Sequence, residues 1–400
     1  MNESIIVRET TETDAPAVVD LAALTWPHIA RSRTEAIIEL DPWRDRQAAF
    51  GAFAGGRLVS YARFHFRPVR VGAAVVNLGG VADVVTHPDF RRRGLARRVL
   101  QAGIASMKSA GLPASLLFTA NPGVYRGLGW RTFHGISGVV DLSGMPRLGR
   151  GRTRITREHV LRLPPALEGV YESGCASHPI SQVRPVAYWR DWPKWMLNEP
   201  NGQTVEHFAS VAWRGASPCA YGLASRSAII ELCCLPGEQD AMLDVFDHLV
   251  EASRADRAVG AVRLDLPYDH AVAAALAPCA TFSTATLGMV LVLDLKAMLH
   301  ALQPALAERA EGIRHDRIRI HSPAGSATVT INDGEVSIGD SQEPCAATLT
   351  GTAFSSLLLG FGSVRALHDA GEVDADPRAL ELLDALFPCR NAHYWAIDRF

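Results

Sequence analysis

The pattern of apolar and polar positions along this chain predicts three successive blocks of helices and strands. In the first block, alternating or β-branched apolar runs predict strands, and apolar spacings of three and four residues predict helices. The expected strands are residues 4–8, 52–66 (a hairpin around Gly55-Gly56), 72–85, 114–119 and 139–142, and the expected helices are 14–24, 94–109 and a turn at Tyr125. Because strands flank a crossover helix, we expect an α/β layer.

The second block repeats the pattern of the first. Its expected elements are strands at 228–235, 261–266 and 289–295 and a helix at 239–255. Asp141-Leu142 and Asp294-Leu295 close the two blocks, about one α/β domain apart, which indicates a duplication. Where the first block carries PDFRRRGLA, the second carries PGEQDAM. An acidic helix start cannot hold the same anion, so we expect the second block to be a structural duplicate.

The third block has a different order of elements, typical of an α+β module. The expected elements are a helix at 295–310, strands at 317–321, 326–331 and 335–338, and helices from 352 to 387. The glycine-rich basic segment 147–154 reads as a linker with solvated arginines. The predicted domains are 1–146, 147–296 and 297–400.

The composition is that of an ordinary globular protein, with 48% hydrophobic and 20% charged residues in 400. The formal net charge of −2 provides no overall field for binding nucleic acid or an anionic membrane. The sequence has no secretory leader pattern and no run of roughly 20 apolar residues, so we expect a cytoplasmic protein. The seven cysteines are scattered without CxxC pairs, so we expect reduced thiols and no metal site.

Five arginines surround one glycine in PDFRRRGLARRVL, residues 88–100. A helix N-terminus carries unpaired N–H groups and about half a positive charge, which favours phosphate. Arg91, Gly94 and Ala96 form the pattern R-x-x-G-x-A at the expected helix start, with small residues where a diphosphate would approach. Neither a Walker loop nor G-x-G-x-x-G is present. The alternative is an arginine-rich helix start that is simply solvated.

This pattern resembles the pyrophosphate-binding motif Q/R-x-x-G-x-G/A of the GNAT N-acetyltransferase superfamily. With its duplicated second block, its third module and its aromatic C-terminal end, the chain resembles the enhanced intracellular survival (Eis) family of bacterial acetyltransferases. The resemblance implies tandem GNAT folds, the second degenerate, followed by a sterol-carrier-like α+β domain whose C-terminus enters the active site. It also implies acetyl-CoA as cofactor, a small-molecule amine as acceptor, and a homo-oligomer, the hexamer.

The resemblance further implies where the cofactor is held. The strand before the phosphate turn, the turn itself and the end of the adjacent strand would form the groove. The implied cofactor-binding residues are Val84, Val85, Thr86, Arg91, Arg92, Arg93, Gly94, Leu95, Ala96, Arg97, Ala120 and Asn121. A backbone N–H near Val84 or Val85 would donate to the oxyanion that develops on the thioester.

Two groups are candidates for proton transfer. By the resemblance, Tyr125 in NPGVYRGLGW would protonate the departing thiolate, because a phenol with a pKa of about 10 stays protonated beside a thiol with a pKa of about 8.5. The α-carboxylate of Phe400 would act as general base, directly or through a water. From the residues alone, a packed loop tyrosine and a terminal aromatic residue that fills a core are the alternatives.

The acceptor amine stays open. Trp26, Glu35 and Asp83 are candidate substrate-binding residues, because a cationic amine favours carboxylates and aromatic faces; surface or core roles are the alternative for each. Arg399 departs from the acidic penultimate residue of aminoglycoside-acetylating relatives, which leaves a polyamine or a lysine-type amine beside an aminoglycoside. A longer-chain N-acyltransferase and a lipid carrier built on the third block are the other functions that the sequence allows.

Overall fold

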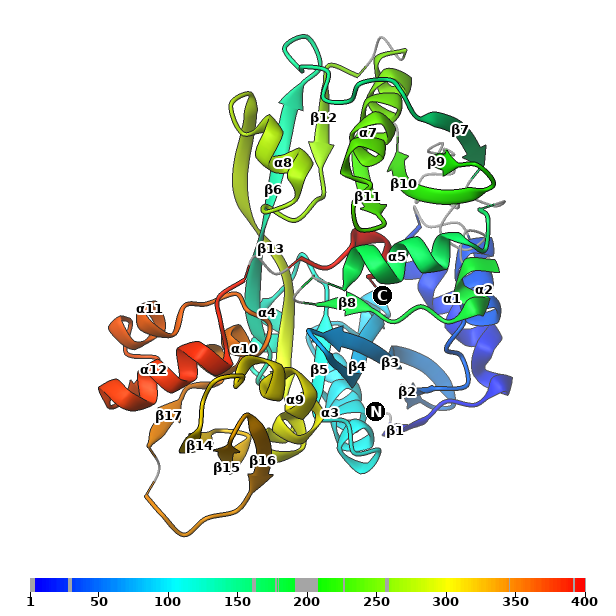
Figure 1. Cartoon of the computed structure of the whole chain (residues 1–400). Helices are drawn as coiled ribbons and strands as arrows, with labels where there is room; N and C mark the ends of the chain where they lie inside the picture. The colour runs from blue at the N-terminus through cyan, green and yellow to red at the C-terminus, as the bar shows by residue number, and fades with distance from the viewer. Residues whose placement is uncertain are drawn as a thin grey trace.

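The structure, a computed structural model, describes residues 4–27, 31–159, 163–176, 178, 180–190, 208–225, 227–255, 259–344, 346–390 and 393–399. Two sheets organise these residues. One has thirteen strands and is shared by the first two blocks, and the other has five strands and belongs to the third block. Figure 1 shows the second block in green at the top, the first block in blue and cyan below it, and the third block in orange beside the first.

The first block forms one half of the large sheet. Its elements are β1 (Ile5–Glu9), α1 (Ala15–Thr25), α2 (Arg31–Leu40), β2 (Gln47–Ala54), β3 (Arg57–Val71), β4 (Ala74–Thr86), α3 (Leu95–Ser109), β5 (Ala114–Leu117), α4 (Gly123–Arg126) and β6 (Arg131–Asp141). Helix α3 packs on β2 and β3, where the ring of Phe64 fills the space that a Cβ at Gly103 would need. Helix α1 also packs on β3.

The second block forms the other half of the same sheet. Its elements are β7 (Arg154–His159), α5 (Leu167–Cys175), β8 (Ser181–Gln182), β9 (Phe208–Arg214), β10 (Ser217–Ser225), β11 (Ala228–Cys234), α7 (Gln239–Arg254), β12 (Ala261–Leu264), α8 (Ala271–Leu276) and β13 (Ala280–Val292). Strand β13 lies between β5 and β6, pairing Met289 with Leu117 and Ala280 with Val140. The two blocks therefore share one continuous sheet.

The third block packs a small sheet, in the order β16-β15-β14-β17-β18, against four helices. Its elements are α9 (Leu295–Arg309), β14 (His315–Ser322), β15 (Gly325–Asn332), β16 (Glu335–Gly339), β17 (Ala347–Leu349), α10 (Gly351–Leu358), α11 (Val364–Asp369), β18 (Val373–Ala375) and α12 (Pro377–Leu386). Its core cluster also takes in Val76 and Leu78 of β4, so the block packs directly on the first. The predicted domain ends at 146 and 296 fall after β6 and in the first turn of α9.

The elements predicted from the sequence are present, but two strands are much longer than predicted. Strand β6 begins at Arg131 and β13 at Ala280, because residues 131–140 and 280–290 pair with each other along their lengths. Pairing between strands so far apart in the sequence leaves no signal in the local pattern of apolar and polar residues. The sequence reading does not predict helices α2, α5 and α8 or strands β7, β8, β9, β10, β17 and β18. No described helix has both the length and the apolar character needed to span a bilayer.

The linker predicted at 147–154 connects the two halves but is not free. Its backbone N–H groups donate to two carboxylates on α7, those of Asp244 and Asp247, at 2.7 to 3.1 Å. Side chains of Arg147 and Arg150 stay exposed, as the charge pattern predicts. The segment is therefore held on α7 by its backbone, and its exposed side chains Arg147 and Arg150 lie within ion-pair distance of carboxylates on the same helix.

Candidate functional site

An open strand edge forms between β4 and β5 in the first block. The two strands run parallel and pair from Leu78 with Ala114 to Val81 with Leu117, where the pairing ends. Strand β4 continues to Thr86 and stays paired with β3 on its other side. Residues beyond Val81 therefore present backbone groups that β5 does not satisfy, the arrangement that the resemblance implies for a cofactor groove.

A β-bulge shapes this edge. Asp83 has a φ of 52°, in the left-handed region that residues with a Cβ rarely adopt. At the same place the register between β3 and β4 shifts between Tyr61 and Arg63. A bulge bends its strand and re-aims side chains, and bulges are common beside active sites. The strain at Asp83 thus coincides with the point where β4 and β5 separate.

The direction of the backbone groups at the edge follows from the ladder with β3. His87 N donates to Val59 O at 2.9 Å. In an antiparallel ladder the hydrogen-bonding direction alternates from residue to residue, so Val85 also faces β3. The N–H groups of Val84 and Thr86 consequently face the open edge. Of the two predicted oxyanion donors, Val84 is the one whose N–H points there.

The arginine-rich turn connects this edge to the N-terminus of α3. Arg92, with φ 60°, and Gly94, with φ 72°, are both left-handed, and a Cβ at Gly94 would meet nothing within 4 Å. Arg98 N donates the first helical bond to Gly94 O at 3.1 Å, so the N–H groups of residues 95–97 have no intrahelical acceptor. Free N–H groups beside a left-handed turn form an anion-binding nest.

The arginine side chains of this turn are exposed and do not pair with acidic neighbours. Arg91 Nε and Arg93 Nη2 donate to main-chain carbonyl oxygens at 3.3 and 2.9 Å. Within the described part of the chain, no ion pair joins a carboxylate to the arginines at 91–93 or 97, and the nearby Asp89 carboxylate lies 3.8 Å from His87 instead. The guanidinium groups are therefore available to an anion.

Tyr125 lies on α4, close to the end of β5. Its hydroxyl group is hydrogen-bonded with Thr119, and its ring lies edge-on to Trp130, with 6.0 Å between the ring centroids. The side chain is buried in the core cluster that also holds Val81 and Leu95. Burial raises the pKa of the Tyr125 phenol above its ordinary value of 10.0, so the hydroxyl keeps its proton at neutral pH.

The end of β5 supplies the other side of the open edge. Ala120 and Asn121, predicted to bind the cofactor, are exposed there, and Asn121 N donates to Thr119 Oγ1 at 2.9 Å. Because β5 pairs with β4 up to Leu117, these residues lie across from the part of β4 beyond Val81. The structure thus brings the predicted strand, turn and loop residues to one edge of the sheet.

A buried charged cluster lies on the face of β3 opposite α3. Arg63, His65 and Arg67 alternate along the strand. They surround the carboxylate of Asp41, whose Oδ2 is 3.8 Å from Arg63, 3.0 Å from His65 and 3.2 Å from Arg67. Arg63 also pairs with Asp83 at 2.6 Å. The Asp83 side chain keeps 31% of its surface exposed, so it connects this cluster to the open edge.

Burial and charge set the protonation of the cluster. Burial, followed by the charges of Arg63 and Arg67, lowers the pKa of His65 from 6.5 to about 4. Burial alone would raise the pKa of Asp41, but the hydrogen bond from His65 and the two guanidinium groups outweigh it and hold that pKa far below its usual range. His65 is therefore neutral at pH 7, and two guanidinium groups balance the carboxylates of Asp41 and Asp83.

The other two predicted substrate-binding residues lie in different surroundings. Trp26 is half-buried and packs on the cluster that includes Tyr61 and Val85, close to the end of β4. Glu35 is exposed on α2, where its carboxylate pairs with Arg31 Nε at 3.2 Å. Trp26 and Asp83 thus lie near the open edge, whereas the Glu35 carboxylate is engaged on the surface.

The C-terminal segment reaches the end of β5. Residues 393–398 are mostly buried, so the segment is docked, as its aromatic and apolar sequence predicts. The Arg399 guanidinium lies 5.5 Å from the centroid of the Phe118 ring, and the Tyr394 ring lies 5.3 Å from it. Phe118 directly follows β5, so Arg399 lies at the open edge. Phe400 itself lies outside the described residues.

The second block has a similar pair of diverging strands but a different environment. Strands β11 and β12 run parallel and pair at only two positions. The carbonyl of Leu232 on β11 is hydrogen-bonded with His270, and α7 begins after Glu238, which pairs with Arg214 at 2.9 Å. A cavity of about 560 Å³ lies beside β11. The described residues that line it include the acidic Asp269 and no arginine or lysine. This edge does not suit a diphosphate.

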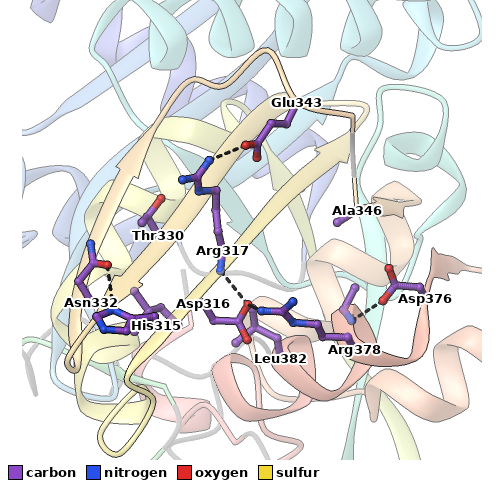
Figure 2. Close-up of a pocket in the computed structure, with 12 residues that line it drawn as sticks. His315, Asp316, Arg317, Thr330, Asn332, Glu343, Ala346, Asp376, Arg378 and Leu382 are labelled. Carbon is purple, nitrogen blue, oxygen red and sulfur yellow. Dashed lines mark hydrogen bonds and ion pairs between the residues drawn. The ribbon is translucent and has the colours of Figure 1, made fainter.

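A polar pocket of about 500 Å³ lies on the third block between β14, β15 and α12 (Figure 2). Its charged side chains pair with one another, Arg317 with Glu343 at 2.6 Å and Arg378 with Asp316 at 2.9 Å. Such walls do not suit a sterol or an acyl chain, which needs mostly apolar lining. Across the described residues, no group of His, Cys, Asp and Glu side chains is arranged to hold a metal ion.

The family comparison agrees with the geometry of the first block. The sequence of residues 6–133 matches the acetyltransferase (GNAT) domain family. These residues form a GNAT acetyltransferase domain. The protein is accordingly an acyltransferase, and the match supports the predicted cofactor of this class, acetyl-CoA. Residues 319–395 match the sterol carrier protein domain family. No curated protein sequence matches the chain.

Solved structures share the fold over the whole chain. A probable N-acyltransferase from Enterococcus faecalis V583 superposes with a TM-score of 0.79 at 16% identity, covering 99% of this chain and 100% of its own. A GCN5-related N-acetyltransferase from Kribbella flavida (0.73, 20% identity, 100% and 99% covered) and Eis1 from Mycobacterium abscessus (0.72, 17% identity, 99% and 100% covered) are similar too. The predicted fold class, tandem GNAT folds followed by a sterol-carrier-like domain, is confirmed.

Sequence reasoning missed the charged face of the acetyltransferase domain. The alternation of Arg63, His65 and Arg67 with apolar residues is typical of a half-exposed strand, but this face is buried. Asp41 stands 22 to 26 positions before these residues and has no motif around it. The available signal is the run of three basic residues at every second position of a predicted strand, which requires a buried acidic partner if that face is covered.

Proposed function

We propose that the protein is an acetyl-CoA-dependent N-acetyltransferase that acetylates a primary amine of a small cationic molecule. The observation that carries the proposal is the arginine-glycine turn at the start of α3. There, exposed guanidinium groups without acidic partners and free N–H groups lie beside the open edge of β4. Charge-assisted bonds and the helix dipole both favour a diphosphate at such a place. The fold shared with Eis1 supports placing the chain in the enhanced intracellular survival family.

Acetyl-CoA supplies an activated acetyl group and a thiolate leaving group. We assign its diphosphate to the turn at 91–97, where the missing Cβ of Gly94 lets an anion approach the backbone. Residues 84–86 and 120–121 would hold the rest of the molecule along the open edge. The N–H of Val84 faces this edge and is the proposed donor to the thioester oxygen. A donor fixed in a strand stabilises developing charge without reorganisation.

Tyr125 is the proposed general acid. Its raised pKa keeps the phenol protonated at neutral pH, whereas a thiol of the cysteine type has a pKa of about 8.5. Proton transfer from the phenol becomes favourable only when charge develops on the sulfur, which is the requirement for a general acid. The position of Tyr125 beside the end of β5 supports this role.

The amine acceptor is assigned to the face of the sheet opposite α3. Asp83 is half-exposed there and offers a carboxylate, and Trp26 lies close to the end of β4. The α-carboxylate of Phe400 is the proposed general base, supported by Arg399, which lies at the end of β5. An α-carboxyl group has a pKa of about 3.5, so its carboxylate is too weak a base to deprotonate a free ammonium group. It accepts the proton from an amine that is already attacking the thioester.

The class of amine follows from the charges at the edge. Arg399 adds a positive charge there, which favours a mono- or diamine of the polyamine or lysine type over an aminoglycoside with several ammonium groups. Longer-chain acyl transfer stays the second candidate. The self-paired charges of the pocket on the third block do not support a lipid carrier. Assembly as a hexamer stays a prediction.

The proposal is tested by measuring thiol release from acetyl-CoA against a panel of polyamines, lysine peptides and aminoglycosides. In the presence of an accepted amine, we expect Tyr125→Phe to lower kcat by about 100-fold or more, because general acid catalysis contributes at least that factor. The phenyl ring stays in the core, so the fold and coenzyme A binding are expected to be retained.

Tyr268→Phe provides the matched control, because this tyrosine is 45% exposed on the second block. Its turnover is expected to equal that of the unchanged protein. Wild-type kcat in Tyr125→Phe would refute the general-acid role. Absence of coenzyme A binding in calorimetry would refute the acetyltransferase function as a whole.

A further inference from the structure

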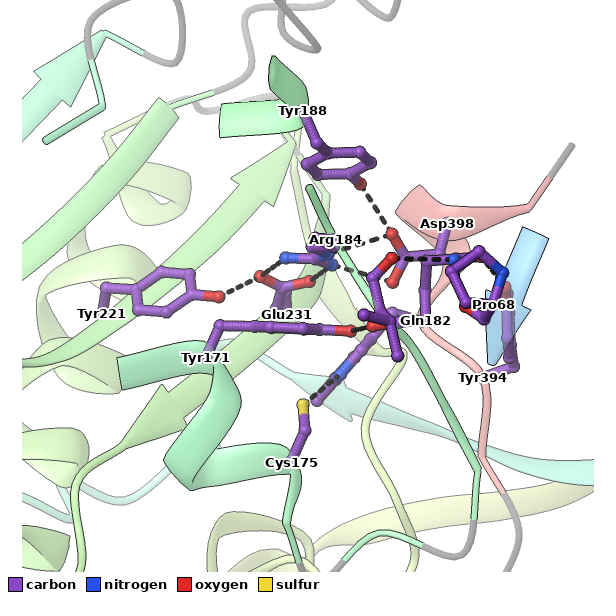
Figure 3. Close-up of polar contacts among 12 residues, drawn as sticks. Pro68, Tyr171, Cys175, Gln182, Arg184, Tyr188, Tyr221, Glu231, Tyr394 and Asp398 are labelled. Atoms are coloured by element: carbon purple, nitrogen blue, oxygen red, sulfur yellow. Dashed lines mark hydrogen bonds and ion pairs between the residues drawn. The ribbon is translucent and has the colours of Figure 1, made fainter. Parts of the chain in front are cut away.

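The C-terminal segment is anchored in the second block by a buried charge network (Figure 3). Arg184 donates from Nε to Asp398 Oδ1 at 3.0 Å and from Nη2 to Asp398 Oδ2 at 2.8 Å. Its Nη1 donates to Glu231 Oε1 at 2.9 Å. The hydroxyl of Tyr188 donates to Asp398 at 2.6 Å, and that of Tyr221 donates to Glu231. The three charged side chains are at most 1% exposed.

Two further contacts hold the same segment just upstream. The hydroxyl of Tyr394 donates to Gln182 Oε1 at 2.8 Å, and Trp395 Nε1 donates to Cys175 Sγ at 3.3 Å. Gln182 in turn donates from Nε2 to Pro68 O of β3 at 2.7 Å, and its strand β8 pairs with β3. The segment is therefore held between the two halves of the large sheet, as the red trace in the centre of Figure 1 shows.

This anchoring fixes the position of Arg399. Arg399 directly follows the anchored Asp398 and lies over the Phe118 ring at the end of β5. Arg399 is therefore held at this end of β5 through the bonds of its neighbour Asp398. The charge network around Arg184 thus connects the second block to the open edge of the acetyltransferase domain.

We propose that Arg184 is a positioning residue of the transfer reaction, which by holding Asp398 sets the place of the chain end at the open edge of β4. The inference rests on the proposed role of the Phe400 carboxylate. The second block does not carry an arginine-glycine turn like that of the first block. Its contribution to the reaction is the buried charge network that holds Asp398. Arg184 acts through Asp398 and touches neither the amine nor the cofactor.

The charge balance of the network supplies a matched pair of variants. Arg184 faces two carboxylates, so removing either one leaves a guanidinium with one buried carboxylate. Removing Arg184 itself would leave two carboxylates without a counter-charge and is expected to disrupt folding. Asp398→Asn and Glu231→Gln both replace a carboxylate by an amide at the same guanidinium. Only Asp398 belongs to the chain end.

Steady-state kinetics and hydrogen exchange of residues 393–399 test the inference on the full chain. For Asp398→Asn we expect kcat to fall about tenfold or more, the KM for acetyl-CoA to stay within about twofold, and exchange at 393–399 to accelerate. For Glu231→Gln we expect a kcat within about threefold of the unchanged protein despite a lower Tm. Asp340→Asn, in an exposed pair with Lys296, controls for the substitution itself and should change none of these.

The outcomes separate the inference from the proposed function. Equal losses of kcat in Asp398→Asn and Glu231→Gln would overturn the positioning role, because the network would then act through stability alone. Unchanged kcat and unchanged exchange in Asp398→Asn would also overturn the positioning role. In that case, loss of turnover in a chain extended beyond Phe400 would still support the proposed base. Faster exchange with unchanged kcat would overturn the positioning role, whereas the base role is tested by the chain extended beyond Phe400.

Discussion

Gly94 and Gly111 stand at the two ends of α3 in nearly the same backbone conformation. Their φ angles are 72° and 71°, and an ideal Cβ at either position would have no heavy atom within 4 Å. A left-handed conformation costs a residue with a Cβ about 1 kcal/mol. A methyl group at either glycine is therefore expected to strain the backbone equally, although only Gly94 belongs to the proposed anion turn.

Gly94→Ala is expected to lower the free energy of unfolding by about 1 kcal/mol and to weaken coenzyme A binding about tenfold, through loss of roughly one charge-assisted bond. Gly111→Ala should lose the same stability and bind coenzyme A normally. Urea unfolding and calorimetric titration of both variants measure the two effects. Equal coenzyme A affinities in the two variants would contradict the assignment of the diphosphate to this turn.

At the scale of the element, the C-terminal segment is a structural part of the molecule rather than a tail. Residues 393–398 are mostly buried, and their side chains bond to α5, β8 and the segment that carries Arg184. Terminal residues usually fray unless they are tied down. The ties here come from polar groups with matched partners, which fixes the position of the segment as well as its burial.

A short glycine-serine extension after Phe400 is expected to lower kcat by about 100-fold, because the proposed base would become an amide without a negative charge. The Tm is expected to change little, since the anchoring contacts end at Asp398. The same extension placed before Met1 serves as the control and should leave turnover intact. A C-terminally extended protein with full turnover would exclude the carboxylate as base.

At the scale of the whole molecule, folding buries a histidine side chain that the unfolded chain exposes to water. His65 is 1% exposed, between Arg63 and Arg67, and its pKa is lowered from 6.5 to about 4, first by burial and then by these two charges. The unfolded chain therefore takes up a proton before the folded protein does as the pH falls. The free energy of unfolding should be unaffected by this group above pH 6.5 and should decrease from there toward pH 4.

We expect His65 to account for a loss of about 3 kcal/mol between pH 7 and pH 4, from the size of its pKa shift. Urea unfolding of the unchanged protein and of His65→Gln across this range measures the contribution as a difference in slope. The buried His270, whose pKa is also lowered to about 4, is present in both proteins, so its contribution cancels in the difference between the two slopes. Identical slopes would indicate that His65 has the same pKa in the folded and the unfolded chain.

The local features of the cofactor groove are readable from the sequence because neighbouring residues determine them. Gly94 after Arg91 marks a left-handed turn and a helix start within four residues, and the apolar run before it marks β4. The docked C-terminus is predicted by composition alone, since an aromatic and apolar end is unfavourable in water. Tyr125 is assigned by resemblance, and the structure adds its burial and its bond to Thr119.

Tertiary structure alone decided which distant residues meet. The pairing of β6 with β13 and the bond of Arg184 to Asp398, 214 positions away, depend on how the two halves of the sheet close on each other. A buried charge is stable only with a partner, and that partner's position in the chain is set by the fold rather than by spacing. Most strands and helices of the first and third blocks and the phosphate-type turn are readable from the sequence, because propensity and hydrophobic period act over a few residues. The charged face of β3 forms only when Asp41 packs against that strand, and the anchor of the chain end forms only when Asp398 meets Arg184.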